Sequence, residues 1–217
     1  MVQLTLSRNG HPGPEFLCLG CHADDIEIGC GGAILKLAEQ YPESIFHWVV
    51  FSASGVREQE ARRGADVFAG SGRLRGPLLK AFPDGFLPYF GGEIKAVFEE
   101  LKRAISPDLI FTHYGSDAHQ DHRLVSELTW NTFRNHMILE YEIPKYDGDM
   151  GRTNFFVPLE EHQYRKKLDL LLETFRSQQE KHWFKTETFL GLMRIRGMEC
   201  NAASGYAEGF YCRKAML

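Results

Sequence analysis

The chain has 217 residues, 43% of them hydrophobic, and a net charge of −4, which is ordinary for a folded globular protein with a sizeable core. The absence of a basic run argues against nucleic acid as the main partner, and no apolar stretch reaches the roughly 18 residues of a membrane span. One domain over residues 1–217 is predicted, with residues 1–15 as a loosely held N-terminal arm.

Five cysteines and an N-terminus without a signal-peptide core favour reduced thiols and a cytoplasmic location. The pair Cys18-x-x-Cys21 has the spacing of a redox motif, but Cys18 falls inside a predicted strand. No second pair completes a zinc knuckle. We therefore interpret these cysteines as packing residues.

Apolar runs of strand length alternate with segments of helical periodicity along the whole chain. Strands are predicted at 16–19, 45–52, 77–82, 108–113, 137–142, 154–157 and 206–211. Helices are predicted at 33–39, 57–68, 92–105, from just after 122 to 134, at 160–175 and at 187–195. The alternation predicts an α/β fold, a Rossmann-like three-layer α/β/α sandwich with a mainly parallel sheet.

Two polar turns, each directly after a predicted strand, hold almost all the unusual side chains. The first is the segment 22–27, HADDIE, and the second is the segment 114–122, YGSDAHQDH. Right-handed crossovers bring the ends of parallel strands to one sheet edge, so the two turns are predicted to meet. The first turn lacks G-x-G-x-x-G spacing and its carboxylates would repel a pyrophosphate, which argues against a dinucleotide site. Histidines beside carboxylates predict a metal site instead.

A catalytic zinc site typically has three protein ligands and one open position. His22 and Asp25, three residues apart, can both reach one ion from a tight turn, and a histidine of the second turn completes the set. Asp24 points differently and is free to take a proton from water at the metal. Singly, each residue has an ordinary alternative: Asp24 or Asp25 as a helix cap, His113 as a structural histidine, Asp121 as a first-turn charge. Two clusters at matching sheet positions favour the metal site.

The two motifs resemble the PIG-L/LmbE-like family of zinc-dependent N-deacetylases. The family pattern His-Pro-Asp-Asp-x-Glu is matched at 22–27, with Ala23 in place of proline, and the pattern His-x-Asp-His is matched at 119–122. Weaker similarities lie at Arg57-x-x-Glu60, Asp84-Gly85, Ser177-Gln178 and Ala207-Glu208-x-Phe210. Because Ala23 supplies no ligand and neither does proline, we expect the site to survive this departure.

The resemblance implies a zinc ion, one per chain, bound by His22, Asp25 and His122, although another divalent metal would suit the same ligands. It also implies that Asp24 is the general base. This assignment agrees with the reading from the residues alone, in which Asp24 is the carboxylate left over from metal binding.

The resemblance further implies that His119 stabilises the developing oxyanion and that Asp121 holds the His119 ring from behind. We assign Arg57 and Asp84 to sugar binding, because their loops are expected to converge on the same sheet edge. Each has an ordinary alternative, a solvated helix end for Arg57 and a turn residue for Asp84.

The surroundings of the site are less specific in the sequence. His113 and Asp117 are expected as rim or supporting groups. The polar segment 141–153 is long enough to form a pocket wall, and its tyrosines, Tyr141 and Tyr146, are expected to stack on a sugar or nucleotide.

The leading prediction is a zinc hydrolase that removes an N-acetyl group from an N-acetylglucosamine-type sugar. The substrate would be a small amino-sugar conjugate, or a polysaccharide or antibiotic precursor. One alternative is an amidase acting on a larger N-acyl group or a sugar–thiol conjugate. Another is a non-catalytic metal- or nucleotide-binding α/β module, against which Asp24 counts because a structural zinc site needs no base. Homo-oligomers are frequent among similar proteins.

Overall fold

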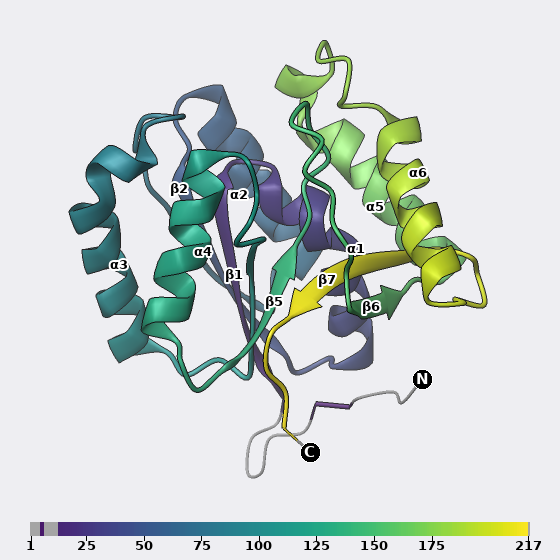
Figure 1. The fold of residues 1–217 in the computed structure, drawn as a ribbon, viewed down its shortest axis with the longest axis horizontal. Coiled ribbons are helices and arrows are strands. Elements are labelled where there is room, and N and C mark those ends of the chain that lie inside the picture. Colours follow the sequence, from purple (N-terminus) through teal and green to yellow (C-terminus); the bar gives the residue numbers. More distant parts are fainter. Residues whose placement is uncertain (1–4, 7–12, 217) are drawn as a thin grey trace.

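The computed structural model describes residues 5–6 and 13–216, so most of the predicted arm at 1–15 lies outside the described residues. A seven-stranded sheet forms the centre of the described chain, in the order β3-β2-β1-β4-β5-β7-β6 (Figure 1). Its strands are β1 Glu15–His22, β2 Ile45–Ser52, β3 Leu74–Leu79, β4 Leu109–His113, β5 Met137–Tyr141, β6 Phe155–Pro158 and β7 Ala207–Cys212. Strands β1 to β5 pair in parallel, whereas β7 is antiparallel to both β5 and β6. The α/β fold and the mainly parallel sheet are confirmed.

Helices cover both faces of this sheet, which gives the three layers (Figure 1). Two helices, α3 and α4, pack on one face with the inward side chains of β1, β2 and β4. The other face carries α1, α2, α5 and α6. The bounds are α1 Asp25–Gln40, α2 Val56–Ala69, α3 Gly91–Ala104, α4 Gln120–Thr132, α5 Glu161–Thr174 and α6 Thr186–Glu199, with short 3₁₀ turns at η1 Leu87–Phe90 and η2 Arg176–Gln178. None of the helices in the described residues is long and apolar enough to cross a membrane.

Strand β1 is buried on both faces because its apolar residues do not alternate with polar ones. Phe16 and Cys18 belong to the core under α1, whereas Leu17 and Leu19 belong to the core under α3 and α4. A strand of this kind suits the centre of a parallel sheet. The chain continues from β1 to β2 on one side, and β4 pairs with β1 on the other. The strand order therefore reverses between β1 and β4, the position at which open α/β sheets bind ligands.

Several element boundaries differ from the prediction, and two of the differences bear on the fold. Strand β3 is Leu74–Leu79 rather than 77–82. Pro77 thus lies inside the strand, which is possible because β3 is at the edge of the sheet, where a missing N–H donor is tolerated. Helix α1 begins at Asp25 rather than at 33, and it contains a kink at Cys30, whose φ of −141° is not helical.

The expectation that Tyr141 stacks on a ligand is wrong, because this residue is fully buried in the core. Its hydroxyl donates to the carbonyl oxygen of Leu19 at 2.7 Å. The ring lies against Gly29, where an added Cβ would clash with it. Tyr146, by contrast, is 68% exposed. The segment 141–153 therefore offers one tyrosine to solvent, since the other ends strand β5 inside the protein.

Candidate metal centre

The two polar turns meet at the sheet edge between β1 and β4. His22 is the last residue of β1, and Asp24 and Asp25 open α1. His119 precedes the first residue of α4, whose first turn contains the other two predicted residues, Asp121 and His122. The structure therefore brings together the six residues predicted as metal ligands or catalytic groups.

Three of these side chains turn one atom each toward a common point. His22 Nδ1 lies 3.3 Å from Asp25 Oδ2 and 3.3 Å from His122 Nε2, and the last two atoms are 3.6 Å apart. Zinc bonds of about 2.0–2.2 Å in tetrahedral geometry place ligand atoms about 3.3–3.6 Å apart. The separations of the three atoms therefore fit a zinc ion bound by His22, Asp25 and His122.

The outer nitrogen of each histidine is held by a carboxylate, which leaves the inner nitrogen without a proton in the neutral ring. His122 Nδ1 lies 3.0 Å from Asp117 Oδ2. His22 Nε2 lies 3.0 Å from Asp84 Oδ1 and 3.3 Å from Asp121 Oδ2. If both rings donate outward, two nitrogen lone pairs and one carboxylate oxygen face one another, which is unfavourable without a cation between them. The residues present thus fit a bound divalent metal.

The charges in the site favour an ionised Asp25. Burial alone would raise the pKa of the Asp25 carboxyl, but His122, His22 and His113 hold this pKa well below its usual range. Burial lowers the pKa of His122, and the nearby His113 lowers it further. Burial also opposes protonation of His22, yet the Asp25 and Asp121 carboxylates raise the pKa of His22 well above its usual value. Without a metal, a proton on His22 compensates part of the negative charge.

Asp24 is not one of the three converging side chains. It precedes α1 as the cap residue, but its side chain makes no capping hydrogen bond, so the capping alternative is not what the structure shows. Asp24 Oδ1 accepts from Arg57 at 2.5 Å, and Asp24 Oδ2 is buried without a hydrogen-bond partner among the described residues. Burial raises the pKa of the Asp24 carboxyl, against the lowering effect of Arg57. A buried carboxylate oxygen without a partner, next to the metal ligands, suits a proton acceptor.

Arg57 is held by a network that explains two of the weaker sequence motifs. Its guanidinium donates to Glu60 at 2.9 Å, and Glu60 accepts from both the backbone N–H and the hydroxyl of Ser177, at 2.8 and 2.7 Å. Arg57 is 25% exposed along its side chain. The Arg-x-x-Glu and Ser-Gln motifs thus meet in space and place Arg57 against Asp24.

Asp121 holds His22 and a neighbouring loop rather than the His119 ring. Its carboxylate accepts from the backbone N–H groups of Gly85 and Leu87, at 2.8 and 3.1 Å, and contacts His22 as described above. The contact with His119 is made by the backbone, since the N–H of Asp121 donates to His119 Nδ1 at 3.2 Å. In the neutral ring the proton of His119 therefore lies on Nε2, which leaves that atom a hydrogen-bond donor.

Lys145, His113, Asp117 and Cys21 surround the ligands, and of these only His113 and Asp117 were expected from the sequence as rim or supporting groups. Lys145 Nζ lies 2.9 Å from Asp117 Oδ2 and 2.6 Å from Asp149 Oδ2. His113 Nε2 lies 3.2 Å from Asp25 Oδ2, and both His113 and Asp117 are buried rather than at the rim. The Cys21 thiol belongs with Asp25, His113 and His122 to a group of possible metal donors. Burial and the Asp25 carboxylate raise the pKa of Cys21 well above its usual value, so without a metal the thiol keeps its proton.

The five cysteines, all within the described residues, are free, and four of them are buried. The interpretation of the Cys18 and Cys21 pair as packing residues is consistent with this arrangement. Cys21 ends the buried part of β1 directly before His22, which is the one sequence position that could have marked it as a neighbour of the metal ligands.

Comparison with known proteins also indicates a deacetylase family. The family model described as "PIG-L: GlcNAc-PI de-N-acetylase" matches residues 17–133, which is more than half of the chain. The conserved protein TT1542 of Thermus thermophilus is similar in structure with a TM-score of 0.72 and 19% identity, over 94% of this chain and 96% of that one. N,N'-diacetylchitobiose deacetylase of Pyrococcus horikoshii gives a TM-score of 0.67 and 20% identity, over 92% and 84%.

A third similar structure has a different activity. GalB of Pseudomonas putida KT2440, a 4-carboxy-2-hydroxymuconate hydratase, gives a TM-score of 0.71 and 17% identity, over 94% of this chain and 98% of that one. At this level of identity the solved structures show that the fold is shared. The reaction must be argued from the family match and from the residues of the site.

Proposed function

This chain belongs to the PIG-L family of de-N-acetylases, hydrolases that cleave amide bonds, and we propose that it uses zinc to remove acetyl from an N-acetylglucosamine-type sugar. The sugar would be part of a small conjugate, as in the diacetylchitobiose named for one similar structure. We further propose that the protein acts in the cytoplasm, where its free cysteines remain reduced.

One observation supports this proposal most directly: three donor atoms at zinc-ligand separations lie beside a buried carboxylate oxygen that has no partner among the described residues. A structural zinc site would close around the ion with a fourth protein ligand. Asp24 is the carboxylate left over from these three ligand atoms, which suits hydrolysis, because a base must reach the water that attacks the amide. This arrangement favours the enzyme over the non-catalytic module.

The proposed roles follow from the contacts of each residue. A bound zinc would polarise the amide carbonyl and lower the pKa of water. Asp24 takes the proton from the attacking water and returns it to the departing amine, while Arg57 keeps the carboxylate in place. His119 donates from Nε2 to the oxygen on which negative charge develops. Asp121 and Asp117 fix the rings of His22 and His122.

Arg57 and Asp84 remain the proposed sugar-binding residues. Asp84 suits this role, because its side chain is 77% exposed while one oxygen is fixed 3.0 Å from His22 Nε2. Its second oxygen can accept a hydroxyl of the sugar. Arg57 is already engaged with Asp24 and Glu60, so any contact with the sugar would be made in addition to its support of the base.

The test combines metal content with release of free amine from methyl N-acetyl-β-glucosaminide and from N,N'-diacetylchitobiose. We expect one zinc per chain, and amine release that is lost in chelator and restored by zinc. Asp24→Asn should keep the metal and lose at least about a thousandfold in kcat, since its amide cannot accept the proton. Zinc binding without any amine release from these sugars would contradict the proposal.

Two controls separate the alternatives. The larger-acyl amidase would use the same residues, so N-butyryl and N-acetyl glucosaminides should be compared at equal concentration. A higher kcat/KM for the butyryl compound would favour that alternative. Hydration of 4-carboxy-2-hydroxymuconate without amine release would instead indicate the activity of the hydratase neighbour.

A further inference from the structure

Four buried side chains form a second group of possible metal donors beside the proposed zinc ligands. Their donor atoms, a thiol sulfur, a carboxylate oxygen and two imidazole nitrogens, all lie within 4.8 Å of one another. We call these residues the inner group: Cys21, Asp25, His113 and His122. None of the four is more than 4% exposed. Asp25 and His122 also belong to the proposed zinc site, whereas Cys21 and His113 have no part in the proposed reaction.

The His113 ring presents a nitrogen lone pair to the Asp25 carboxylate. Its Nε2 accepts from the backbone N–H of Cys21 at 3.0 Å, which places the proton of the neutral ring on Nδ1, an atom without a partner among the described residues. The same Nε2 lies 3.2 Å from Asp25 Oδ2. A proton on Nε2 would not remove this conflict, because the N–H of Cys21 would then lose its acceptor. In a buried site such an arrangement is unfavourable without a cation.

The inner group offers the ligand types of a four-coordinate metal site. Asp25 Oδ2 lies 3.2 Å from His113 Nε2 and 3.6 Å from His122 Nε2, close to the separations of about 3.3–3.6 Å between ligand atoms around a tetrahedral zinc ion. Cys21 adds a sulfur, the kind of ligand that soft metal ions prefer. Four protein ligands would leave no position for water, as in structural zinc sites.

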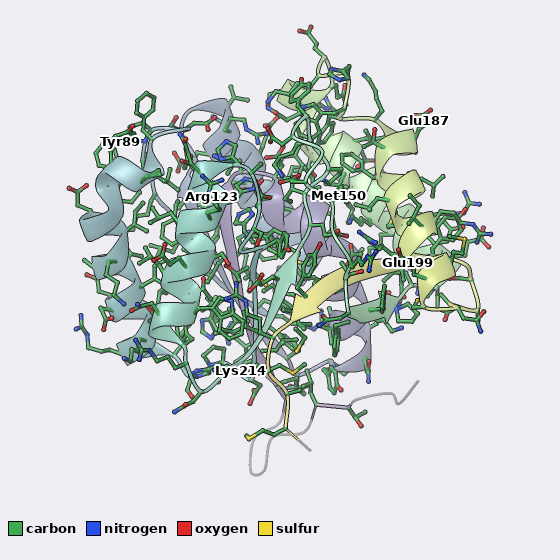
Figure 2. All side chains as sticks on the ribbon, in the orientation of Figure 1. Tyr89, Arg123, Met150, Glu187, Glu199 and Lys214 are labelled. Carbon is green, nitrogen blue, oxygen red and sulfur yellow. The ribbon has the colours of Figure 1, made fainter. Side chains whose placement is uncertain are left out.

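The backbone that carries part of the inner group is held in place by Arg123. Figure 2 shows this residue near the end of α4 at which the helix begins, directly after His122. Its guanidinium donates to the backbone carbonyl oxygens of Asp117 and Ala118, at 2.9 and 2.5 Å. These bonds fix the turn that leads into α4. An ion would therefore meet donors that are already positioned, which lowers the ordering cost of binding.

We propose that the inner group is a second, closed metal site that binds a divalent ion softer than zinc, with Cd²⁺ as the probe. The softer ion and zinc compete, because both need Asp25 and His122, while zinc takes His22 and the softer ion takes the Cys21 sulfur. Binding breaks the S–H bond of Cys21 and forms a sulfur–metal bond, the proton leaves to solvent, and no electron is transferred. Only the effect of this ion on hydrolysis rests on the proposed function.

Titration of the metal-free protein with cadmium chloride tests this site through the ultraviolet charge-transfer band of a cadmium-bound thiolate. We expect the band to saturate at one ion per chain in the wild type and to be absent in Cys21→Ser. Loss of a supporting partner alone costs about 10- to 100-fold in metal affinity, so loss of this ligand should weaken cadmium binding at least as much. Cys18→Ser is the matched control and should keep the band, because Cys18 is equally buried on β1 but belongs to the core under α1.

Two variants separate the inner group from the proposed zinc site. His22→Gln removes a zinc ligand that the inner group does not use, so it should keep the thiolate band although zinc no longer raises its Tm. Cys21→Ser should lose the band and keep the zinc-dependent rise in Tm, which also shows that this variant is folded. A band that survives in Cys21→Ser, or that is lost in His22→Gln, would overturn the inference. Cadmium-113 magnetic resonance of the wild type needs no variant, and a bound ion without a sulfur ligand would overturn it as well.

The closed site also predicts how the softer ion affects hydrolysis. Cadmium should stop amine release by the zinc-loaded wild type at a concentration at least about tenfold lower than Cys21→Ser requires, since the variant lacks the sulfur ligand. Equal sensitivity of the two proteins to cadmium would overturn the inference. If the zinc-loaded protein releases no amine from any sugar, the proposed function fails, whereas the thiolate band and its dependence on Cys21 still decide whether the inner group binds the ion.

Discussion

Arg57 supports the proposed general base, and this role can be separated from sugar binding. The guanidinium lowers the pKa of the Asp24 carboxyl, which burial raises. In Arg57→Met that lowering effect is lost, so the pKa of Asp24 rises and the base is deprotonated only at higher pH. We expect the acid limb of the kcat/KM profile to move to higher pH, with kcat reduced by at least about tenfold at pH 6.

The control for Arg57 lies on the same helix. Arg62 pairs with Glu58 at 3.0 Å, and both side chains are about half exposed, so their interaction contributes little. Arg62→Met should leave the pH profile where it is. A higher KM in Arg57→Met with an unchanged pH profile would assign Arg57 to the sugar alone.

Asp117 should determine metal affinity although it is not a ligand. It is 2% exposed and lies between His122 Nδ1 and Lys145 Nζ. Replacing it with alanine frees the imidazole to rotate and removes the acceptor that keeps the proton on Nδ1. Loss of such a partner typically costs about 10- to 100-fold in metal affinity. Competition with a chromophoric chelator should show this loss in Asp117→Ala, while Asp147→Ala, a change of an exposed acidic residue in the nearby loop, should have the wild-type affinity.

At the scale of single residues, the sequence predicted which side chains come together at the candidate site, through residue types at short spacing. His22 and Asp25 belong to one turn, and His119 and His122 belong to another, so a few residues per turn were enough to recognise them. Lys145 could not be predicted, because its partner Asp117 is 28 residues away and only the fold brings them together. The hydrogen bonds from the Gly85 and Leu87 N–H groups to Asp121 could not be predicted from the sequence for the same reason.

At the scale of elements, the kink of α1 explains the closing Ala-Glu-x-Phe motif. Glu208 of β7 accepts from the backbone N–H groups of Gly32 and Ala33, at 2.8 and 2.6 Å, directly after the kink at Cys30. It therefore satisfies donors that the interrupted helix cannot satisfy itself. Glu208 also pairs with Lys167 of α5 at 2.6 Å, and both side chains are 3% exposed.

The pair formed by Glu208 and Lys167 gives a prediction for stability. In Glu208→Ala the Lys167 ammonium is left as an uncompensated buried charge, and the two N–H groups of α1 lose their acceptor. Removing one partner of a buried ion pair costs about 3–5 kcal/mol in the free energy of unfolding. Urea denaturation should show this loss. The double variant with Lys167→Met should be more stable than Glu208→Ala alone, and an equal stability of the two would argue against the ion pair as the cause.

The element boundaries show which features a sequence pattern captures. The strand at 45–52 was predicted with its observed bounds because a buried parallel strand is a continuous apolar run. The kink in α1 gave no such signal, since it depends on a carboxylate 176 residues away in the chain. The antiparallel direction of β7 was equally hidden, because a strand's own residues do not record its direction in the sheet.

At the scale of the whole molecule, a metal should stabilise the fold, because its ligands come from two distant segments. A ligand that binds only the native state, at a free concentration 100 times its dissociation constant, adds about 2.7 kcal/mol to the free energy of unfolding. For a chain of this size, that addition corresponds to a rise in Tm of roughly 5–10 °C. The rise should be reversed by a chelator.

The size of this rise should depend on pH through His22. In the metal-free protein the pKa of His22 is raised by the Asp25 and Asp121 carboxylates, against burial. The stability from this protonated ring is fully present below the unfolded pKa of about 6.5 and is lost as pH rises through the higher folded pKa. Zinc must displace the same proton. The difference in Tm with and without zinc should therefore widen as pH rises from acid through the folded pKa of His22.

Thermal unfolding with zinc and with chelator, at several pH values, measures this linkage without any substrate. His22→Gln should abolish most of the zinc-dependent rise in Tm at every pH. His162→Gln is the matched control, because His162 is 64% exposed on α5 and pairs with Glu39 away from the site, so this variant should keep the full rise and its pH dependence. A rise in Tm that is constant with pH would show that zinc does not compete with a proton at His22. The metal would then bind elsewhere, and the assignment of the converging nitrogens would have to be abandoned.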